Sequence, residues 1–292
     1  MKLFLKDIIK QFNKANTLTK LIYINIGIFI ILQFSFVFSF LFNIEELQIS
    51  SLLALPADIV NLKKCPWTII TYMFIHQSIL HLIFNILWLF FSGKIFLSLF
   101  SNKQLISTYI LGGISGAILF ILSFNIFPVF EHNINNSYAI GASASVLAII
   151  MAIATKSPNY EISLFIFGKI KLKHIAIASI LIDILSIPNG NAGGHIAHLG
   201  GAFYGFIYVR QYESGNDISS GFNNLIDYIY CQLIKRSKIK KIYSKDNSEE
   251  SYLKRKLDEQ AKIDNILDKI AKSGYDGLTS KEKDILFKAS KK

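Results

Sequence analysis

The sequence predicts an all-α protein that crosses a membrane six times and carries a small helical tail after the last crossing. The chain is 52% hydrophobic and only 17% charged, whereas soluble domains are typically about 25% charged. Apolar stretches long enough to cross a bilayer recur along it. The lysines and arginines lie between these stretches and at the two ends, as expected for loops beside a membrane.

The net charge of +11 would also suit a protein that binds nucleic acid. Because the basic residues flank apolar spans, we instead expect them to face the cytoplasm and anionic lipid. The lipid bilayer is therefore the predicted partner, and nucleic acid is not. Cys65 and Cys231 are expected on opposite sides of the membrane, so neither a disulfide framework nor a thiolate metal site is predicted.

Residues 1–20 carry five lysines among apolar residues and form a basic amphipathic segment that is expected to lie on the membrane surface. A secretory signal is not expected, since the apolar run that follows is too long and lacks a small-residue cleavage site. Residues 21–42 are long enough to span. Residues 43–75 are too apolar for a solvated loop, and we expect them to lie partly in the interface.

Five further spans follow, and the fourth of the six is short for a full crossing of about 20 residues. Its N-terminus should therefore line a water-filled recess, because bare backbone cannot face lipid. Residues 159–173 alternate in polarity and suggest a small extended element at the interface. The third span has a GxxxG face. The five ranges are 78–97, 105–127, 143–155, 174–187 and 193–209.

The distribution of basic residues sets the orientation. Loops 128–141 and 188–194 contain no Lys or Arg, and the first outer loop carries only Lys63 and Lys64, whereas the connections on the other side are rich in Lys. Both termini are therefore predicted on the cytoplasmic side. The membrane domain should cover residues 21–212, and residues 213–292 read as a soluble tail. Helical spacing and a capping box predict a helical hairpin at about 250–290.

Ser143 opens the fourth span. A serine at a helix start is most often an N-cap, but polar groups at membrane depth tend to be functional. The neighbouring Gly141, Ala142 and Ala144 are small, which leaves the hydroxyl accessible and its backbone N–H free to face a developing oxyanion. Ser143 is therefore a candidate nucleophile.

The sixth span carries the candidate base. Gly201 and Gly205 form a GxxxG face, and His198 lies three residues before Gly201, on much the same side. The fourth span has small residues at four-residue spacing from Ala144, so the two helices can pack closely and bring His198 to Ser143. His195 is one turn away and is the weaker candidate, since it lies nearer the helix end.

His81 and Asn85 stack on one side of the second span. Two such polar residues can simply form hydrogen bonds to neighbouring helices. In a functional interpretation, they instead donate hydrogen bonds to the carbonyl oxygen of a substrate. His76 should be exposed at the mouth of the span, without a chemical role. Asp183 is the only acid well inside a span. The sequence leaves three roles open for it: orienting a histidine, hydrogen bonding to backbone, or facing water.

These residues form three motifs in order. The second span reads His76-Gln-Ser-Ile-Leu-His81-Leu-Ile-Phe-Asn85, an HxxxxHxxxN pattern. The fourth reads Gly141-Ala-Ser143-Ala144, and the sixth Ala197-His198-Leu-Gly-Gly201-Ala-Phe-Tyr-Gly205, an AHxxGxxxG pattern. Over roughly residues 20–210 the chain resembles the rhomboid intramembrane serine proteases, apart from alanine at 144 in place of the usual glycine. The end of the tail resembles extensions on some bacterial rhomboids.

The resemblance implies a six-span rhomboid-like bundle with a Ser143–His198 dyad and no acid, and it favours His198 over His195 as the base. Asn85, His81 and backbone N–H groups beside Gly141 would form the oxyanion hole. Substrates would be transmembrane proteins cut near the outer leaflet through an acyl-enzyme, without metal or cofactor. A multi-pass protein of the bacterial cytoplasmic membrane is implied.

Three alternatives differ in class. A non-catalytic rhomboid-like membrane chaperone or substrate-binding scaffold would use the recess only for recognition. A metal-dependent protease is disfavoured, since no HExxH helix is present. A transporter is disfavoured because only one acid lies well inside a span. The physiological substrate and the oligomeric state do not follow from the sequence.

Overall fold

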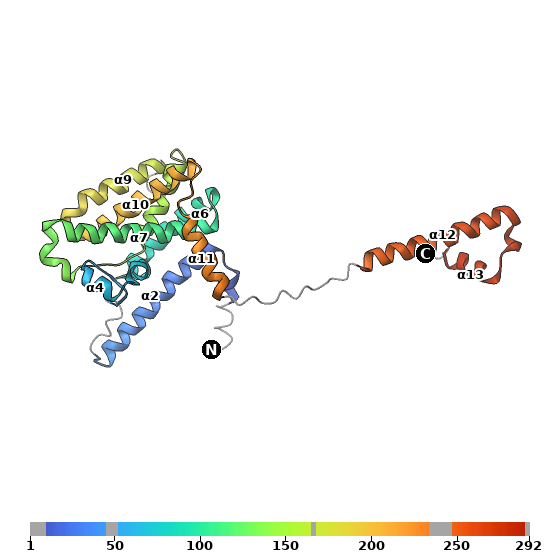
Figure 1. The fold of residues 1–292 in the computed structure, drawn as a ribbon, viewed down its shortest axis with the longest axis horizontal. Helices are drawn as coiled ribbons and strands as arrows, with labels where there is room; N and C mark the ends of the chain where they lie inside the picture. Colours follow the sequence, from blue (N-terminus) through green and yellow to red (C-terminus); the bar gives the residue numbers. More distant parts are fainter. Residues whose placement is uncertain (1–9, 45–51, 165–167, 234–246, 290–292) are drawn as a thin grey trace. The chain divides into compact units, whose positions relative to one another are not determined.

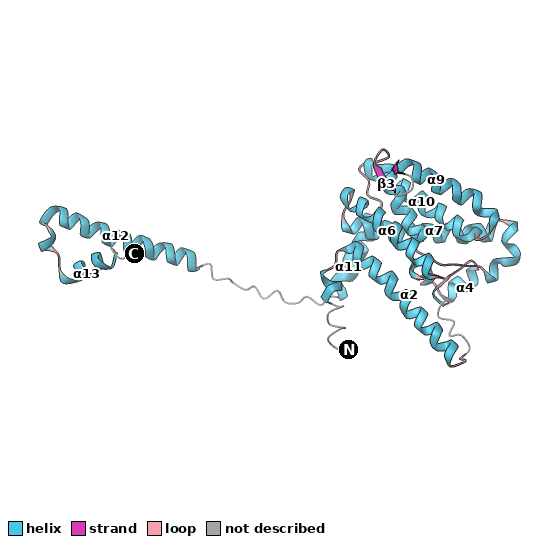
Figure 2. Cartoon of the chain, turned by 180° about the vertical axis from the view of Figure 1, so that it is seen from behind, coloured by secondary structure: helices cyan, strands magenta, loops and turns pink. Residues whose placement is uncertain are grey.

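The computed structural model describes residues 10–44, 52–164, 168–233 and 247–289. The chain divides into two compact units, Met1–Tyr230 and Cys231–Lys292. Nearly all regular structure is helical, as Figure 2 shows by colour. The first unit is a bundle of membrane helices, and the second is a pair of helices.

Within the described residues, four helical stretches are long and apolar enough to cross a membrane: Thr17–Leu41 (α2), Ile79–Leu99 (α6), Asn102–Ile126 (α7) and Leu172–Asn189, which begins with α9 (Leu172–Ser186). Two more helices complete the bundle (Figure 1): α8 (Ser143–Lys156) and α10 (Ala192–Glu213). The prediction of an all-α membrane bundle is confirmed. The helices begin and end within a few residues of the predicted spans, except that α2 and α10 are each longer at one end.

The short helix α8 lies in the middle of the bundle, where 10 of its 14 residues are buried. Its backbone is approached closely by α10, because a Cβ added at Gly201 or Gly205 would overlap the carbonyl group of Ala144 or Ala148. A Cβ at Gly112 of α7 would likewise overlap Ala148. Since protein surrounds α8, its short length leaves no bare backbone facing lipid.

The outer helices α2 and α9 carry the lipid-facing surface. Only 17% of the most apolar stretch of α2, and likewise of Leu172–Asn189, is buried. Large side chains such as Phe34 and Leu185 are 72% and 70% exposed. A surface this apolar would be unusual on a soluble protein and is expected for one facing acyl chains.

Residues 52–74 are more regular than the predicted interfacial loop. They contain β1 (Leu55–Pro56), α4 (Ile59–Lys64), α5 (Thr68–Thr71) and the 3₁₀ helix η1 (Tyr72–Phe74). Leu55 and Met73 are fully buried, so part of this segment belongs to the protein core. Strand β1 pairs antiparallel with β2 (Tyr138–Ala139), which follows the 3₁₀ helix η2 (Pro128–Asn136). This pairing ties the segment to the residues just before α8.

Residues 159–173 contain an antiparallel hairpin of β3 (Glu161–Leu164) and β4 (Gly168–Lys171), in keeping with the extended element expected there. After the 3₁₀ helix η3 (Ile187–Asn189) and α10, helix α11 (Ser220–Leu233) was not predicted. It contacts the bundle through an ion pair of 2.7 Å between Lys103 and Asp227.

The second unit consists of α12 (Asn247–Ser273), the 3₁₀ helix η4 (Tyr275–Gly277) and α13 (Ser280–Ala289). Glu282 accepts hydrogen bonds from the backbone N–H of Thr279 and from Lys269 of α12. The start of α13 is thus fixed to its neighbour. The first nine residues of the predicted basic segment 1–20 lie outside the described residues.

Candidate active site

A cavity of about 1130 Å³ opens among α2, α6, α8, α9 and α10. Its polar lining includes Ser143, His198, Asp183, His81 and Asn85. Apolar side chains of α2, α6 and α8 form much of the remaining wall. The cavity is therefore large enough to admit water and an extended peptide segment beside a small polar centre.

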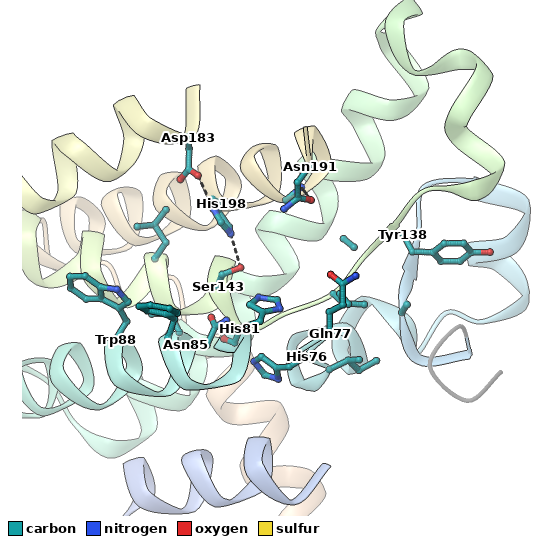
Figure 3. A pocket seen from close by; sticks show the side chains of 18 of the residues that line it. His76, Gln77, His81, Asn85, Trp88, Tyr138, Ser143, Asp183, Asn191 and His198 are labelled. Atoms are coloured by element: carbon teal, nitrogen blue, oxygen red, sulfur yellow. Dashed lines mark hydrogen bonds and ion pairs between the residues drawn. The ribbon is translucent and has the colours of Figure 1, made fainter. Parts of the chain in front are cut away.

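The centre of this site is a hydrogen bond of 2.6 Å between Oγ of Ser143 and Nε2 of His198 (Figure 3). Ser143 is the first residue of α8, and His198 lies nearly two turns into α10. The close packing at Gly201 brings the two helices near enough for a short hydroxyl to reach an imidazole. The Ser143 side chain points into the cavity, whereas Ser145 is completely buried.

A carboxylate lies on the other side of the imidazole. Oδ1 of Asp183 in α9 is 2.8 Å from Nδ1 of His198, and the same oxygen is 2.8 Å from Nδ1 of His195. A carboxylate accepts hydrogen bonds, so Nδ1 of His198 carries the proton and Nε2 offers a lone pair to the Ser143 hydroxyl. The resemblance implied a dyad without an acid, whereas here an acid contacts the histidine.

Gly141 shapes the entry to α8. Its φ is +122°, a conformation that favours glycine, and a Cβ there would lie 2.9 Å from the His81 ring. Its N–H donates to the carbonyl of Tyr72 at 2.9 Å. The first N–H groups of a helix have no intrahelical acceptor, so the N–H of Ser143, the first residue of α8, is not used within the helix.

His81 and Asn85 of α6 approach Ser143 from the side opposite His198 (Figure 3). Ser78 caps α6 by accepting from the backbone N–H of His81 at 3.2 Å, and Nδ2 of Asn85 donates to the His81 carbonyl at 2.9 Å. An amide nitrogen has two hydrogens. One hydrogen of Asn85 Nδ2 is therefore left for a ligand in the cavity.

The expectation that His76 is exposed is wrong, because only 4% of it is accessible. Its ring packs edge-on against His81, with 5.2 Å between centroids. Burial and the neighbouring His81 lower the pKa of His76 to about 4. His76 is therefore neutral at ordinary pH and supports the position of His81.

The structure thus gathers Ser143, His198, His81 and Asn85 around one cavity, with Gly141 against the His81 ring. Gly201, Gly205 and Ala144 lie at the contact between α8 and α10. The sequence left the roles of Asp183, His195 and His76 open, and of these Asp183 contacts the candidate base most directly. Its two partners lie 12 and 15 residues further along the chain, across a turn. The signal that could have found it was the rarity of an acid within a membrane span.

The fold defines a multi-pass membrane protein built on an all-α bundle. A family model described as the Rhomboid domain matches residues 63–212, half of the chain, and the chain belongs to the rhomboid family. A second model, described as a family of unknown function (DUF6576), matches residues 246–292, which contain α12 and α13. The predicted family is confirmed.

Two curated proteins are similar over the membrane domain. Presenilin-associated rhomboid-like protein A, mitochondrial, from Danio rerio is 29% identical over 141 residues, which cover 47% of this chain and 35% of that protein. RHOMBOID-like protein 12, mitochondrial, from Arabidopsis thaliana is 27% identical over 157 residues, covering 51% and 47% respectively. The matched region thus spans less than half the length of either relative.

Proposed function

We propose that this chain is an intramembrane serine endopeptidase that cleaves transmembrane segments of membrane proteins near the outer leaflet. The observation that carries this proposal is the 2.6 Å contact between Ser143 Oγ and His198 Nε2 inside a cavity of a membrane bundle. A hydroxyl becomes a useful nucleophile when an adjacent base can remove its proton.

In the proposed reaction, His198 takes the hydroxyl proton through Nε2 while Oγ of Ser143 attacks a peptide carbonyl. Negative charge then develops on the carbonyl oxygen. Ser143, Asn85 and His81 all line the cavity, and we assign the N–H of Ser143 and the side chains of Asn85 and His81 as the donors to this oxygen. Such fixed donors stabilise the transition state without having to reorganise during the reaction.

The imidazolium of His198 then gives its proton to the leaving amine, and water hydrolyses the acyl-enzyme with His198 again acting as base. Asp183 acts through His198: its carboxylate holds the proton on Nδ1 and faces the positive charge that develops on the ring. It is therefore a positioning residue. The reaction as written uses no metal or cofactor.

Substrates would be membrane proteins whose transmembrane helix unwinds locally, because an intact helix shields its carbonyls in internal hydrogen bonds. The distribution of Lys and Arg supports an orientation with both termini cytoplasmic and the cavity in the outer half of the bilayer. A bacterial cytoplasmic membrane remains the proposed location. We also propose residues 21–212 as the catalytic domain and residues 213–292 as a cytoplasmic tail.

The proposal is tested with purified chain in nanodiscs, a model transmembrane substrate and a fluorophosphonate probe for reactive serines. Ser143→Ala and His198→Ala should abolish cleavage, and Ser143→Ala should abolish labelling. Ser145→Ala, a buried serine on the same helix, is the matched control and should retain both. Full cleavage by Ser143→Ala would refute the proposal, whereas substrate binding without labelling or cleavage would favour the scaffold alternative.

A further inference from the structure

His195 has no role in the proposed reaction, yet its ring is held on the carboxylate that positions the base. Nδ1 of His195 and Nδ1 of His198 each lie 2.8 Å from the same oxygen of Asp183. The two rings are nearly perpendicular, with 6.0 Å between their centroids. Two imidazoles converging on one carboxylate oxygen are more than a single base needs.

The three ligand-type atoms lie within 4.8 Å of one another. Two imidazole nitrogens and one carboxylate oxygen are a donor set that Zn²⁺ binds, with a fourth position left for water. A tetrahedral Zn²⁺ needs its ligand atoms roughly 3.3 Å apart, given bonds of about 2.0–2.1 Å. Each nitrogen lies 2.8 Å from the Asp183 oxygen and all three atoms lie within 4.8 Å of one another, so side-chain shifts of no more than about 1.5 Å reach that spacing. Mg²⁺ and Ca²⁺ prefer all-oxygen ligands and do not suit the site.

Water and ions can reach this cluster. Asp183 and His198 line the cavity, and the side chains of His195 and His198 are 21% and 24% exposed, whereas Asp183 is 8% exposed. Ile182, beside Asp183, also lines the cavity, and no cationic side chain is among the described residues that line it. A divalent cation entering the cavity would therefore meet a carboxylate flanked by two imidazole rings.

From this geometry we propose that Asp183, His195 and His198 form a Zn²⁺ site whose occupation switches off the protease. The inference rests on the proposed function in one respect: it takes His198 as the base. Zn²⁺ is here an inhibitory ligand that binds behind the base, on the side of His198 away from Ser143.

The switch follows from the tautomers of imidazole. In the hydrogen-bonded state Nδ1 of His198 carries the ring proton, and Nε2 can accept the proton of Ser143. A metal ion needs the lone pair on Nδ1, so the neutral ring must then carry its proton on Nε2. The proton moves from one ring nitrogen to the other through solvent, with none gained or lost. Nε2–H then donates to Ser143 Oγ and cannot take its proton.

The test uses the full chain in nanodiscs, stripped of metal with a chelator. Zn²⁺ binding is measured by calorimetry and by the visible absorption of Co²⁺ as a probe ion. Fluorophosphonate labelling and cleavage are measured with and without Zn²⁺. His195→Asn is the main variant, because an asparagine amide nitrogen can keep the hydrogen bond to Asp183 while binding Zn²⁺ poorly. His132→Asn, on the exposed η2, is the matched control.

The parent chain and His132→Asn should bind Zn²⁺ and lose labelling and cleavage when it is bound. His195→Asn should keep basal cleavage and bind Zn²⁺ at least about tenfold more weakly, since even outer-shell changes cost 10- to 100-fold in metal affinity. The Zn²⁺ concentration that halves fluorophosphonate labelling of His195→Asn should be higher than that of the parent by the same factor. Ser143→Ala should bind Zn²⁺ like the parent.

Equal Zn²⁺ affinity in the parent and His195→Asn would overturn the site. Zn²⁺ binding that leaves labelling and cleavage unchanged would overturn the switch. The proposed function fails separately: a parent chain that neither labels nor cleaves without Zn²⁺ refutes the protease, while calorimetry and Co²⁺ absorption still report on the metal site.

Discussion

Oδ1 of Asp183 lies 2.8 Å from Nδ1 of His198, and Nε2 of the same ring lies 2.6 Å from Oγ of Ser143. Three helices thus contribute one group each to a continuous hydrogen-bonded row: α9 the carboxylate, α10 the imidazole and α8 the hydroxyl. The carboxylate acts on the hydroxyl only through the ring, by fixing which nitrogen carries the proton.

Asp183→Asn is therefore expected to lower kcat with little change in KM. General acid–base catalysis contributes about 10²–10⁴-fold, and this range is the upper bound for the loss. The asparagine oxygen can still accept from Nδ1–H in one amide orientation, so part of the rate should remain. Steady-state cleavage of a transmembrane substrate in nanodiscs at several substrate concentrations separates kcat from KM.

His195→Asn in metal-free buffer is the control for this prediction, because it changes the other partner of the Asp183 carboxylate and leaves the hydrogen bond between Asp183 and His198 in place. It should keep a near-parent kcat. If Asp183→Asn also keeps the parent kcat, or loses rate only in proportion to the folded fraction seen by thermal unfolding, Asp183 has no positioning role.

The second prediction concerns Asn85. Asn85→Ala should lower kcat by about 10²–10³-fold, the usual effect of removing one oxyanion donor, with KM nearly unchanged. Asn125→Ala is the matched control, since Asn125 donates to the carbonyl of Ala57 at 2.9 Å in a structural contact. That variant should lower the unfolding temperature and spare kcat. If Asn85→Ala instead lowers the unfolding temperature and leaves kcat unchanged, Asn85 has a structural role only.

The bilayer made much of this fold predictable. A span must be apolar over about 20 residues, so hydropathy located α6 at residues 78–97, against Ile79–Leu99 in the structure. The contact between α8 and α10 was predictable from the four-residue spacing of Gly and Ala, because small residues are what allow two membrane helices to approach. Ser143 and His198 could be paired on that basis.

Residues whose surroundings depend on tertiary packing were less predictable. The sequence places His76 at the mouth of a span, but its ring is buried and packs against His81 of α6. No periodicity in the sequence indicates that burial. Asp183 of α9 and His198 of α10 are separated by the turn that contains η3. The conformation of this turn determines which face of α9 contacts α10. Spacing along one helix carries no information about that path.

The third prediction tests the helix contact. A Cβ at Gly201 would overlap the carbonyl of Ala144, which is backbone and cannot move aside without shifting α8. Gly201→Ala should destabilise the bundle by about 1–3 kcal/mol, the usual cost of overpacking. It should also reduce serine labelling, because shifting α8 separates Ser143 from His198.

Gly27→Ala in α2 is its control. Nothing lies within 4 Å of a Cβ added there, so this variant should be neutral or stabilise the helix by up to about 1 kcal/mol. Thermal unfolding and probe labelling in nanodiscs measure both variants. Equal stability and labelling of Gly201→Ala and the parent would mean that α8 and α10 are not in close contact.

The last prediction concerns the tail. The backbone N–H of Thr279, the Lys269 ammonium and the Thr279 hydroxyl lower the pKa of Glu282 from 4.5 to about 2. A lowered carboxylate pKa contributes stability that is present above the unfolded value and lost as pH falls through the folded value. The amides of α13 should therefore lose protection between about pH 4.5 and pH 2.

Hydrogen exchange on the full chain in nanodiscs measures this loss for Ser280–Ala289. Glu282→Gln should exchange faster than the parent at neutral pH and should no longer respond to pH over that window, because its side chain does not ionise. Asp264→Asn on α12 removes one negative charge elsewhere on the hairpin and should keep the parent's response. If Glu282→Gln also keeps it, the acid sensitivity of the tail arises from other groups, and the hydrogen bonds to Thr279 do not set it.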